Sequence, residues 1–269
     1  MTGEAGVPLP PPPPGPAPAL SLRGLTKRFG ATTAVDHLDL DVPAGSFYGV
    51  VGPNGAGKTT TLSMATGLLR PDTGRAVVLG EDLWQDPVRA KRRLGVLPDG
   101  VRLFDRLSGL ELVRYTGLLR GLPRDVVESR AVELLDALGL AAAGPTLVVD
   151  YSAGMTKKIA LACALVHAPR LLVLDEPFEA VDPVSGATIR EILTAYVAGG
   201  GTVVLSSHVM DLVERLCDHV AVISAGRVLA AGPLDAVRAG VRLEERFVAL
   251  VGGHKDLTGS LAWLQTGPR

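Results

Sequence analysis

The pattern of hydrophobic and polar positions predicts a series of short strands separated by helices. Apolar and polar side chains alternate around Leu22 and Leu25 and again over residues 38–42, a period of two that is typical of half-buried strands. A short apolar strand is expected at residues 46–51, followed by a glycine-rich turn and a helix over residues 58–69. Further apolar strands are predicted at residues 76–79, 94–97, 171–174, 202–205, 219–223 and 227–230.

The middle of the chain, from about residue 108 to 140, carries a helical pattern instead. Ser108 and Glu111 have the spacing of a capping box, in which each side chain binds a free backbone N–H group of the other residue. Another helix is predicted over residues 183–197 between two of the later strands, and a last one from about Arg242. This order of elements predicts an α/β domain with helices inserted between its two halves.

Composition agrees with one such domain and excludes some classes of protein. The chain has 269 residues, of which 47% are hydrophobic and only 4% aromatic, so aliphatic side chains must fill a sizeable core. The formal net charge is -1, without the basic excess of proteins that bind nucleic-acid phosphates, and no nucleic-acid partner is expected. Cys163 and Cys217 lie outside any metal-ligand spacing and are expected to be buried, reduced thiols.

No segment is apolar enough to predict a membrane span or a signal peptide. The longest apolar run, residues 159–174, is interrupted by His167, Pro169 and Arg170. Residues 1–19 are dominated by proline, which predicts a disordered extension of polyproline II character, with a docking peptide for a proline-binding module as the alternative. Any contact with a membrane is therefore expected to go through a partner protein.

The glycine-rich turn carries the pattern G-x-x-x-x-G-K-(S/T) at residues 52–59. Glycines permit the dihedrals that turn consecutive N–H groups toward phosphate oxygens, Lys58 adds a positive charge for the β- and γ-phosphates, and the Thr59 hydroxyl can ligate Mg²⁺. The following helix points its positive end at the same anion. The turn is predicted to bind the phosphates of a nucleotide through Gly52, Pro53, Asn54, Gly55, Ala56, Gly57, Lys58, Thr59 and Thr60.

Two carboxylates follow the apolar strand at residues 171–174. Asp175 is placed to hold the hydration shell of Mg²⁺, and Glu176 to polarise a water molecule that attacks the γ-phosphate. The pattern is weak alone because any buried strand can end in acids, but a phosphate-binding loop in the same chain makes it specific. Glu176 is the expected general base, and Lys58 is expected to contribute to catalysis.

Between these two motifs, the sequence Tyr-Ser-Ala-Gly-Met at residues 151–155 opens a predicted helix. This motif makes the resemblance specific: the chain resembles the ATP-binding subunits of ABC transporters over about residues 20–240. The signature of that family is Leu-Ser-Gly-Gly-Gln or a variant that begins Tyr-Ser and ends Gly-Met. In that family the serine, the second glycine and the positive end of the helix bind the γ-phosphate of ATP held by the opposite subunit. The resemblance implies this role for Ser152 and Gly154.

The resemblance implies three further site residues. Phe29 lies where the family stacks an aromatic ring on adenine, although a phenylalanine at a strand end can also belong to the core. Asp182 matches the aspartate of the family's D-loop. His208 matches the histidine that contacts the γ-phosphate and supports the catalytic geometry.

The sequence departs from the family pattern at three positions. Ala153 replaces the first signature glycine, and Glu179 replaces a small residue at the start of the D-loop. Asp99 stands where the family has the glutamine of its glutamine loop, and this side chain is shorter and charged. As a carboxylate it is expected to ligate Mg²⁺ or water, so that the expected metal ligands are Thr59, Asp175 and Asp99.

The resemblance also implies the architecture. An α/β fold is expected, in which a P-loop NTPase core carries an N-terminal antiparallel β-subdomain and an inserted α-helical subdomain at about residues 99–165. The ATP-binding domain would span residues 20–240, after the extension at 1–19 and before a C-terminal helix and tail at 241–269. A homodimer with composite sites is implied, because each signature motif completes the site of the other copy.

The leading hypothesis is the ATP-hydrolysing subunit of an exporter of the ABC-2, multidrug-exporter-like group. It would use ATP and Mg²⁺ and act at the cytoplasmic face of the membrane on a separate permease, for a drug-like or lipid-like cargo. Two alternatives stay open at this point: a soluble ABC-type ATPase acting on ribosomes or DNA, and a nucleotide-binding regulator that no longer hydrolyses ATP. Asp99 and Ala153 motivate the last alternative, whereas Glu176 and His208 favour hydrolysis.

Overall fold

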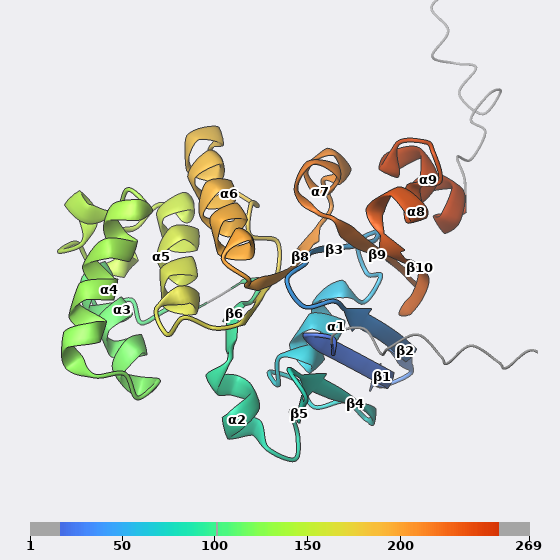
Figure 1. Ribbon diagram of the computed structural model, residues 1–269, viewed down its shortest axis with the longest axis horizontal. Helices are drawn as coiled ribbons and strands as arrows, with labels where there is room; N and C mark the ends of the chain where they lie inside the picture. Colours follow the sequence, from blue (N-terminus) through green and yellow to red (C-terminus); the bar gives the residue numbers. More distant parts are fainter. Residues whose placement is uncertain (1–16, 101, 253–269) are drawn as a thin grey trace, which may run out of the picture.

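A six-stranded sheet forms the centre of the computed structural model, which describes residues 17–100 and 102–252 (Figure 1). The strand order is β10-β9-β3-β8-β7-β6; neighbours from β9 to β6 are parallel, and β10 is antiparallel to β9. All residues of the three central strands are buried, and strands covered on both faces are expected to be near-continuous apolar runs. The strands are β3 (Phe47–Val51), β6 (Leu94–Leu97), β7 (Leu171–Leu174), β8 (Thr202–Ser207), β9 (His219–Ser224) and β10 (Arg227–Pro233).

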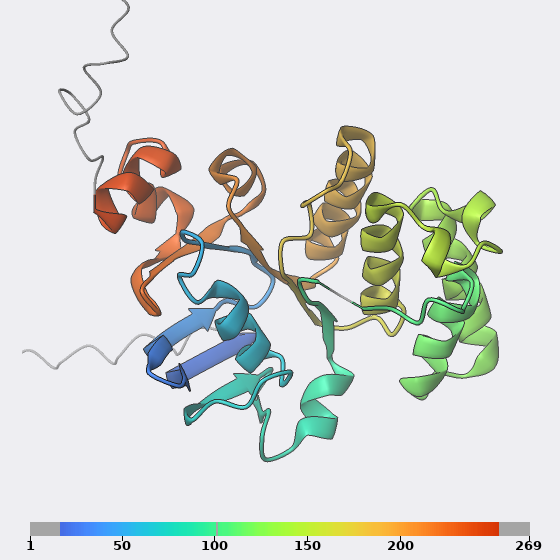
Figure 2. The same ribbon diagram turned by 180° about the vertical axis from the view of Figure 1, so that it is seen from behind.

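The two faces of this sheet belong to separate hydrophobic cores. Phe47, Leu172 and Leu205 pack on one face with side chains of α5, α6 and α7. Tyr48 and Val173 pack on the other face with α1 and the second sheet. Figure 2 shows α1 and α6 on opposite sides of the central strands. The helices are α1 (Lys58–Ala65), α5 (Ala153–Leu165), α6 (Pro183–Ala198) and α7 (Met210–Leu216).

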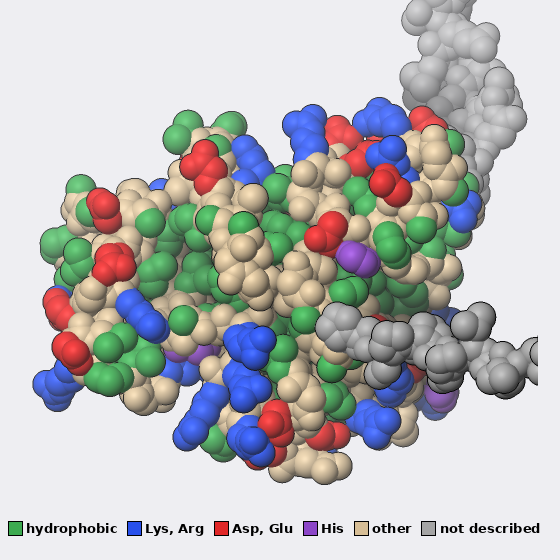
Figure 3. Space-filling model, in the orientation of Figure 1, with side chains coloured by type: hydrophobic (Ala, Val, Ile, Leu, Met, Phe, Trp, Pro, Cys, Tyr) green, Lys and Arg blue, Asp and Glu red, His purple; other side chains and the backbone are tan. Residues whose placement is uncertain are grey.

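The second sheet is antiparallel and has the strand order β2-β1-β4-β5. Its strands are β1 (Leu20–Phe29), β2 (Thr32–Val42), β4 (Thr73–Val78) and β5 (Glu81–Asp82). The register pairs Leu22 with Leu40 and Leu25 with Leu38, so the alternating apolar side chains share the buried face. The short helix α2 (Pro87–Arg92) follows, with Arg89, Lys91 and Arg92 in its last turn. Figure 3 shows Lys and Arg side chains gathered in this part of the molecule.

Helices α3 (Gly109–Leu119) and α4 (Arg124–Ala137) stand with α5 beside the sheet (Figure 1). The predicted capping box starts α3: Ser108 Oγ accepts from the Glu111 N–H at 3.3 Å, and Glu111 Oε2 accepts from the Ser108 N–H at 2.8 Å. Two turns of 3-10 helix, at residues 141–143 and 148–150, lead into α5.

The C-terminal segment packs against α7. β9 and β10 are joined by Ala225 and Gly226, which both have positive φ, as a tight hairpin turn requires. Helices α8 (Leu234–Arg238) and α9 (Leu243–Val251) follow. Arg238 and Arg242 form ion pairs with acidic residues of α7 at 3.0 and 2.7 Å.

Several element boundaries differ from those predicted. The helix after the glycine-rich turn ends at Ala65 instead of Leu69, because Gly67 adopts a φ of 72° that the helix cannot continue through. Helices α2, α7 and α8 were not predicted, since segments of 6, 7 and 5 residues are too short to display a helical period. Most of the proline-rich segment and the tail, residues 1–16 and 253–269, lie outside the described residues.

The cysteines are free thiols, as predicted, with Cys217 buried and Cys163 half-buried. Desolvation raises the pKa of the Cys163 thiol to about 11 and raises the pKa of Cys217 as well, so both stay protonated near neutral pH. Within residues 17–100 and 102–252, the helices are too short or too polar to cross a bilayer.

Gly95 in β6 leaves no room for a larger residue. A Cβ atom there would lie 2.3 Å from the Ala164 carbonyl oxygen and 2.8 Å from Leu172 Cδ1. We expect Gly95→Ala to lower the free energy of unfolding by about 1–3 kcal/mol through overpacking. In the control Gly186→Ala, the new Cβ would meet only Arg190, at 3.6 Å, and helix propensity should raise stability by up to about 1 kcal/mol. Denaturant unfolding followed by circular dichroism measures both, and equal losses would contradict the packing argument.

Candidate active site

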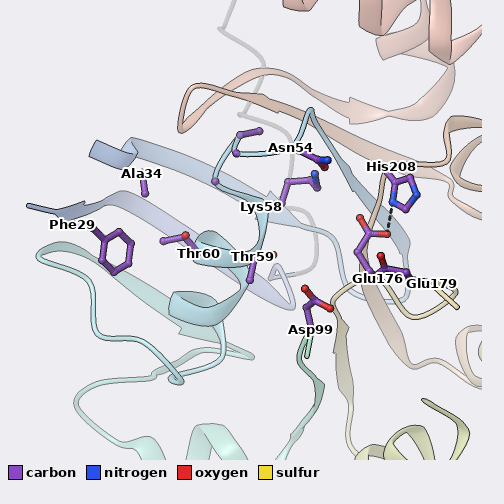
Figure 4. Close-up of a pocket in the computed structure, with 13 residues that line it drawn as sticks. Phe29, Ala34, Asn54, Lys58, Thr59, Thr60, Asp99, Glu176, Glu179 and His208 are labelled. Atoms are coloured by element: carbon purple, nitrogen blue, oxygen red, sulfur yellow. Dashed lines mark hydrogen bonds and ion pairs between the residues drawn. The ribbon is translucent and has the colours of Figure 1, made fainter. Parts of the chain in front are cut away.

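A cavity of about 630 Å³ lies where the parallel strands end. Figure 4 shows its side chains converging from β1, from the loop after β3, and from the segments that follow β6, β7 and β8. Because parallel strands end at one edge of a sheet, segments far apart in the sequence meet there. The lining residues are Phe29, Ala34, Asn54, Gly55, Ala56, Gly57, Lys58, Thr59, Thr60, Asp99, Glu176, Glu179 and His208.

The loop between β3 and α1 is shaped by close backbone approaches. A Cβ atom at Gly52 would lie 2.3 Å from the Ile223 carbonyl oxygen, and one at Gly57 would lie 2.4 Å from the Ala34 carbonyl oxygen. Gly57 also has a φ of 99°. Packing therefore requires glycine at both positions, and backbone conformation requires it at Gly57 as well.

Lys58 folds back over this loop. Its Nζ donates to the carbonyl oxygens of Gly52 at 2.8 Å and Pro53 at 3.3 Å, and the residue is only 8% exposed. Among the described residues, no side chain caps the start of α1, so its first N–H groups are available to an anion. A cation and a helix end that point into one cavity fit a phosphate group.

Asp175 is the buried acid of the site, with 4% of its surface exposed. Its backbone N–H donates to the Leu97 carbonyl oxygen at 2.8 Å, and its Oδ1 accepts from Ser206 Oγ at 2.5 Å. Asp175 lies behind the cavity and does not line it. The hydrogen bond from Ser206 fixes one carboxylate oxygen, and the other is left to act on a ligand.

Glu176 is held in an unusual conformation. Its φ is 47°, in the left-handed region that costs a non-glycine residue about 1–2 kcal/mol. Its N–H donates to Ser206 Oγ at 2.9 Å, so one serine contacts both acids. Its Oε2 lies 3.0 Å from Nδ1 of His208 (Figure 4). Because an ionised carboxylate only accepts hydrogen bonds, Nδ1 carries the proton and Nε2 remains free for another partner.

Phe29 and Asp99 stand at opposite parts of the cavity (Figure 4). Phe29 is 52% exposed at the end of β1, which excludes the alternative that it is a core residue. Lys27 Nζ lies 5.8 Å from the centroid of its ring. Asp99 follows β6 and faces the cavity below Thr59, with Oδ1 accepting from the neighbouring Gly100 N–H at 2.8 Å.

The signature residues lie away from this cavity. Ser152 is the exposed N-cap of α5, and its Oγ accepts from the Met155 N–H at 3.2 Å. Gly154 lies in the first turn, where a Cβ atom would be 3.7 Å from Asp182 Oδ2. Asp182 caps α6, and hydrogen bonds from the side chain and the backbone of Ser185 lower the pKa of its carboxyl group. The structure thus brings Ser152, Gly154 and Asp182 together, but not with the phosphate loop of the same chain.

Sequence reasoning missed Ser206 and Ala34. Ser206 is fully buried at the end of β8, two residues before His208. A polar side chain inside an apolar strand needs a hydrogen-bond partner, and this requirement was the available signal. The contribution of Ala34 comes through tertiary packing of β2 over the loop, which the sequence does not reveal.

The residues present fit Mg²⁺ better than a metal held by protein alone. In the described part of the chain, no three His, Cys, Asp or Glu side chains converge into a metal site. Mg²⁺ usually keeps several waters and is bound through one or two carboxylates and the phosphates of a substrate. A buried carboxylate at Asp175, near α1, and a hydroxyl at Thr59 in the phosphate loop agree with that chemistry.

The chain matches the ABC transporter family over residues 35–179. A daunorubicin/doxorubicin resistance ATP-binding protein, DrrA of Streptomyces peucetius, is 43% identical over 209 residues, which cover 78% of this chain and 63% of that protein. A Nod factor export ATP-binding protein I of Cupriavidus metallidurans is 39% identical over 79% of this chain and 70% of that protein. The chain therefore spans about two thirds of the length of these curated relatives.

Solved structures share the fold. One described as the ATP binding subunit of an ABC transporter is 29% identical, with a TM-score of 0.82 over 87% of this chain and 100% of that chain. The dimeric ATP-binding cassette MJ0796, described as bound to ADP and Pi, has a TM-score of 0.74 over 80% of this chain and 98% of that one. At 24% identity, the latter shows the fold alone.

These matches confirm the predicted fold class, an α/β fold with an antiparallel β-subdomain and a helical part, and the predicted class of ATP-binding transporter subunit. The chain belongs to the ABC transporter family, among its ATP-binding proteins.

Proposed function

We propose that the protein hydrolyses Mg²⁺-ATP as one of two identical subunits that drive a separate membrane permease in export. The proposal depends on one observation: the phosphate loop, Glu176 and His208 line one cavity, and Ser206 joins Glu176 to the buried Asp175. Relatives named for daunorubicin resistance and Nod factor export support outward transport of a drug-like or lipid-like cargo.

Binding of ATP begins at the phosphate loop. Residues 54–60 line the cavity, and free N–H groups of this loop, together with the Lys58 ammonium, would hold the β- and γ-phosphates. Phe29 offers a half-exposed ring at the other end of the cavity, where adenine would stack. Thr59 would hold Mg²⁺ directly and Asp175 would hold it through its hydration shell, while Asp99 lines the same cavity as Thr59. A bound Mg²⁺ would neutralise charge on the reacting phosphoryl group.

Hydrolysis requires a base beside the γ-phosphate. Glu176 is 15% exposed and its carboxylate can accept a proton from the attacking water. His208 donates through Nδ1 to Glu176 Oε2, which orients the carboxylate. Phosphate oxygens only accept hydrogen bonds, so Nε2 would contact the phosphate as an N–H of the imidazolium ring. Lys58 would offset the charge that develops on the phosphate oxygens.

A second copy of the chain would complete each site. Ser152, Gly154 and the N-terminus of α5 form a phosphate-binding surface, but they lie outside the cavity of their own chain. Asp182 packs beside Gly154 and would belong to the same contact. The dimeric description of a protein with this fold supports a pair of copies. In the proposed pair, ATP would lie between the phosphate loop of one copy and the signature of the other.

A permease subunit would dock near the segment that follows Asp99. Phe104 and Tyr115 are 59% and 41% exposed, and their rings meet edge to face at 5.4 Å. An exposed aromatic pair suits an interface with another protein. The protein would then act at the cytoplasmic face of the membrane through this partner, and ATP-dependent movement near Asp99 would reach the permease.

Glu176→Gln tests the assignment of the base. Glutamine keeps the size of the side chain but cannot accept a proton, so steady-state phosphate release should fall by about 100-fold or more. Binding of a fluorescent ATP analogue should change by less than about threefold, because the phosphate loop is intact. Equal hydrolysis rates in the two proteins would refute the role of Glu176.

Ser206→Ala tests how the acids are positioned. The change removes the hydroxyl that binds Asp175 Oδ1 and the Glu176 N–H, and leaves a buried carboxylate with one partner fewer. We expect kcat to fall by about 10-fold or more, and the Mg²⁺ concentration that gives half the maximal rate to rise. Ser46→Ala is the control, since it removes another buried hydroxyl that binds only the Pro43 carbonyl oxygen. Equal kcat losses in both variants would mean that Ser206 acts through stability alone.

Phe29→Ala tests the adenine contact. Loss of a base-stacking ring is worth about 1–3 kcal/mol, so KM for ATP should rise by about 5-fold or more while kcat stays within about twofold. Phe29→Tyr should keep the wild-type KM. Leu119→Ala provides a control, because it shortens another exposed apolar side chain (69% exposed) outside the cavity. An unchanged KM in Phe29→Ala would exclude stacking on the nucleotide.

A further inference from the structure

A lysine of the signature helix binds the backbone of the general base. Lys157 Nζ donates to the Glu176 carbonyl oxygen at 2.9 Å. Lys157 is half-buried in α5, less than one turn after Gly154. The hydrogen bond therefore joins the helix that begins at Ser152 to the residue that the proposed function makes the base of the same chain.

The carbonyl that Lys157 binds belongs to the strained residue of the loop. Glu176 has a φ of 47°, and Ala180, four residues later, has a φ of 58°. The Glu176 carbonyl oxygen also accepts from the Glu179 N–H at 3.2 Å, so its two lone pairs are both used. On the other side, the Glu176 N–H is held by Ser206 at 2.9 Å. Strained positions persist only where such surrounding contacts determine them.

The same helix also contacts the far end of this loop. An atom at the Cβ position of Gly154 would lie 3.7 Å from Asp182 Oδ2 and 4.0 Å from the Ala180 carbonyl oxygen. Lys157 therefore joins α5 to the start of the loop of residues 176–182, and the first turn of α5 lies close to the end of that loop. A displacement of α5 would act on the start of the loop through this hydrogen bond.

We propose that Lys157 is a positioning residue that makes the placement of Glu176 depend on the position of the signature helix. The inference rests on the proposed function, in which the N-terminus of α5 binds the nucleotide held by a second copy. When that nucleotide fixes the position of α5, Lys157 holds the Glu176 carbonyl. His208 then holds the Glu176 carboxylate, and Ser206 holds its N–H. Occupancy of one composite site thereby raises hydrolysis in the other.

Lys157→Met removes the donor and keeps most of the apolar stem of the side chain. We expect kcat for ATP hydrolysis by the full chain to fall by about 10- to 100-fold, with KM within about twofold. The Hill coefficient for ATP should fall toward 1, a readout that loss of stability alone does not move. Lys157→Arg keeps a donor in reach and should recover kcat to within about threefold of wild type. Lys91→Met is the matched control, because Lys91 also donates to a main-chain carbonyl, that of Gly67, away from the cavity.

Two results would overturn the inference. One is a Lys157→Met protein with wild-type kcat and Hill coefficient; the other is an equal loss of kcat in Lys157→Met and Lys91→Met. ATP-driven dimerisation of Glu176→Gln, with and without Lys157→Met, separates positioning from nucleotide binding. Unchanged dimerisation supports positioning, and its loss would assign Lys157 to the signature contact instead. Failure of the proposed function is distinguishable, because wild type itself would then release no phosphate from Mg²⁺-ATP.

Discussion

Parallel pairing of β3, β8 and β7 is the constraint on which the site depends. The register sets Val51 beside Ser207 and Leu174 beside Leu205, so the strands end almost level with one another. The N–H and C=O groups of each buried strand form hydrogen bonds within the sheet. Burial of a polar side chain costs free energy, so charged side chains are placed where the strands end. The phosphate loop, the two acids and His208 therefore share one edge, although they come from three distant parts of the chain.

The cost of this arrangement is concentrated at Glu176. Its left-handed backbone would relax if the residue were free, since the strain is comparable to one or two ordinary hydrogen bonds. Three side chains from different elements oppose that relaxation: Ser206 at the N–H, Lys157 at the carbonyl and His208 at the carboxylate. In the proposed function, a Glu176 carboxylate fixed in this way would not have to reorganise during reaction, and such preorganisation is the main source of electrostatic catalysis in enzymes.

The sequence predicts the parts of this site that depend on local pattern. Consecutive residues determine the phosphate loop, and a strand that ends in two acids predicts Asp175 and Glu176. Lys157 and Ser206 could not be assigned in the same way, because their roles depend on which backbone groups tertiary packing places opposite them. The short helix α7 is not predicted for a related reason. Its seven residues carry too little periodicity, and contacts with α9 and the residue before it stabilise α7 instead.

In the proposed function, the N-terminus of α5 binds the nucleotide of a second copy. Ser152 Oγ accepts a hydrogen bond from the Met155 N–H, which fixes the side chain and leaves its O–H able to donate. Asp182 lies close to Gly154, and this surface would receive a phosphate without rearrangement. The main cost of association would then be the translational and rotational entropy that the two copies lose. A nucleotide that binds both surfaces would supply the favourable free energy. ATP would thus be both the substrate and the bond between the subunits, and hydrolysis would remove that bond.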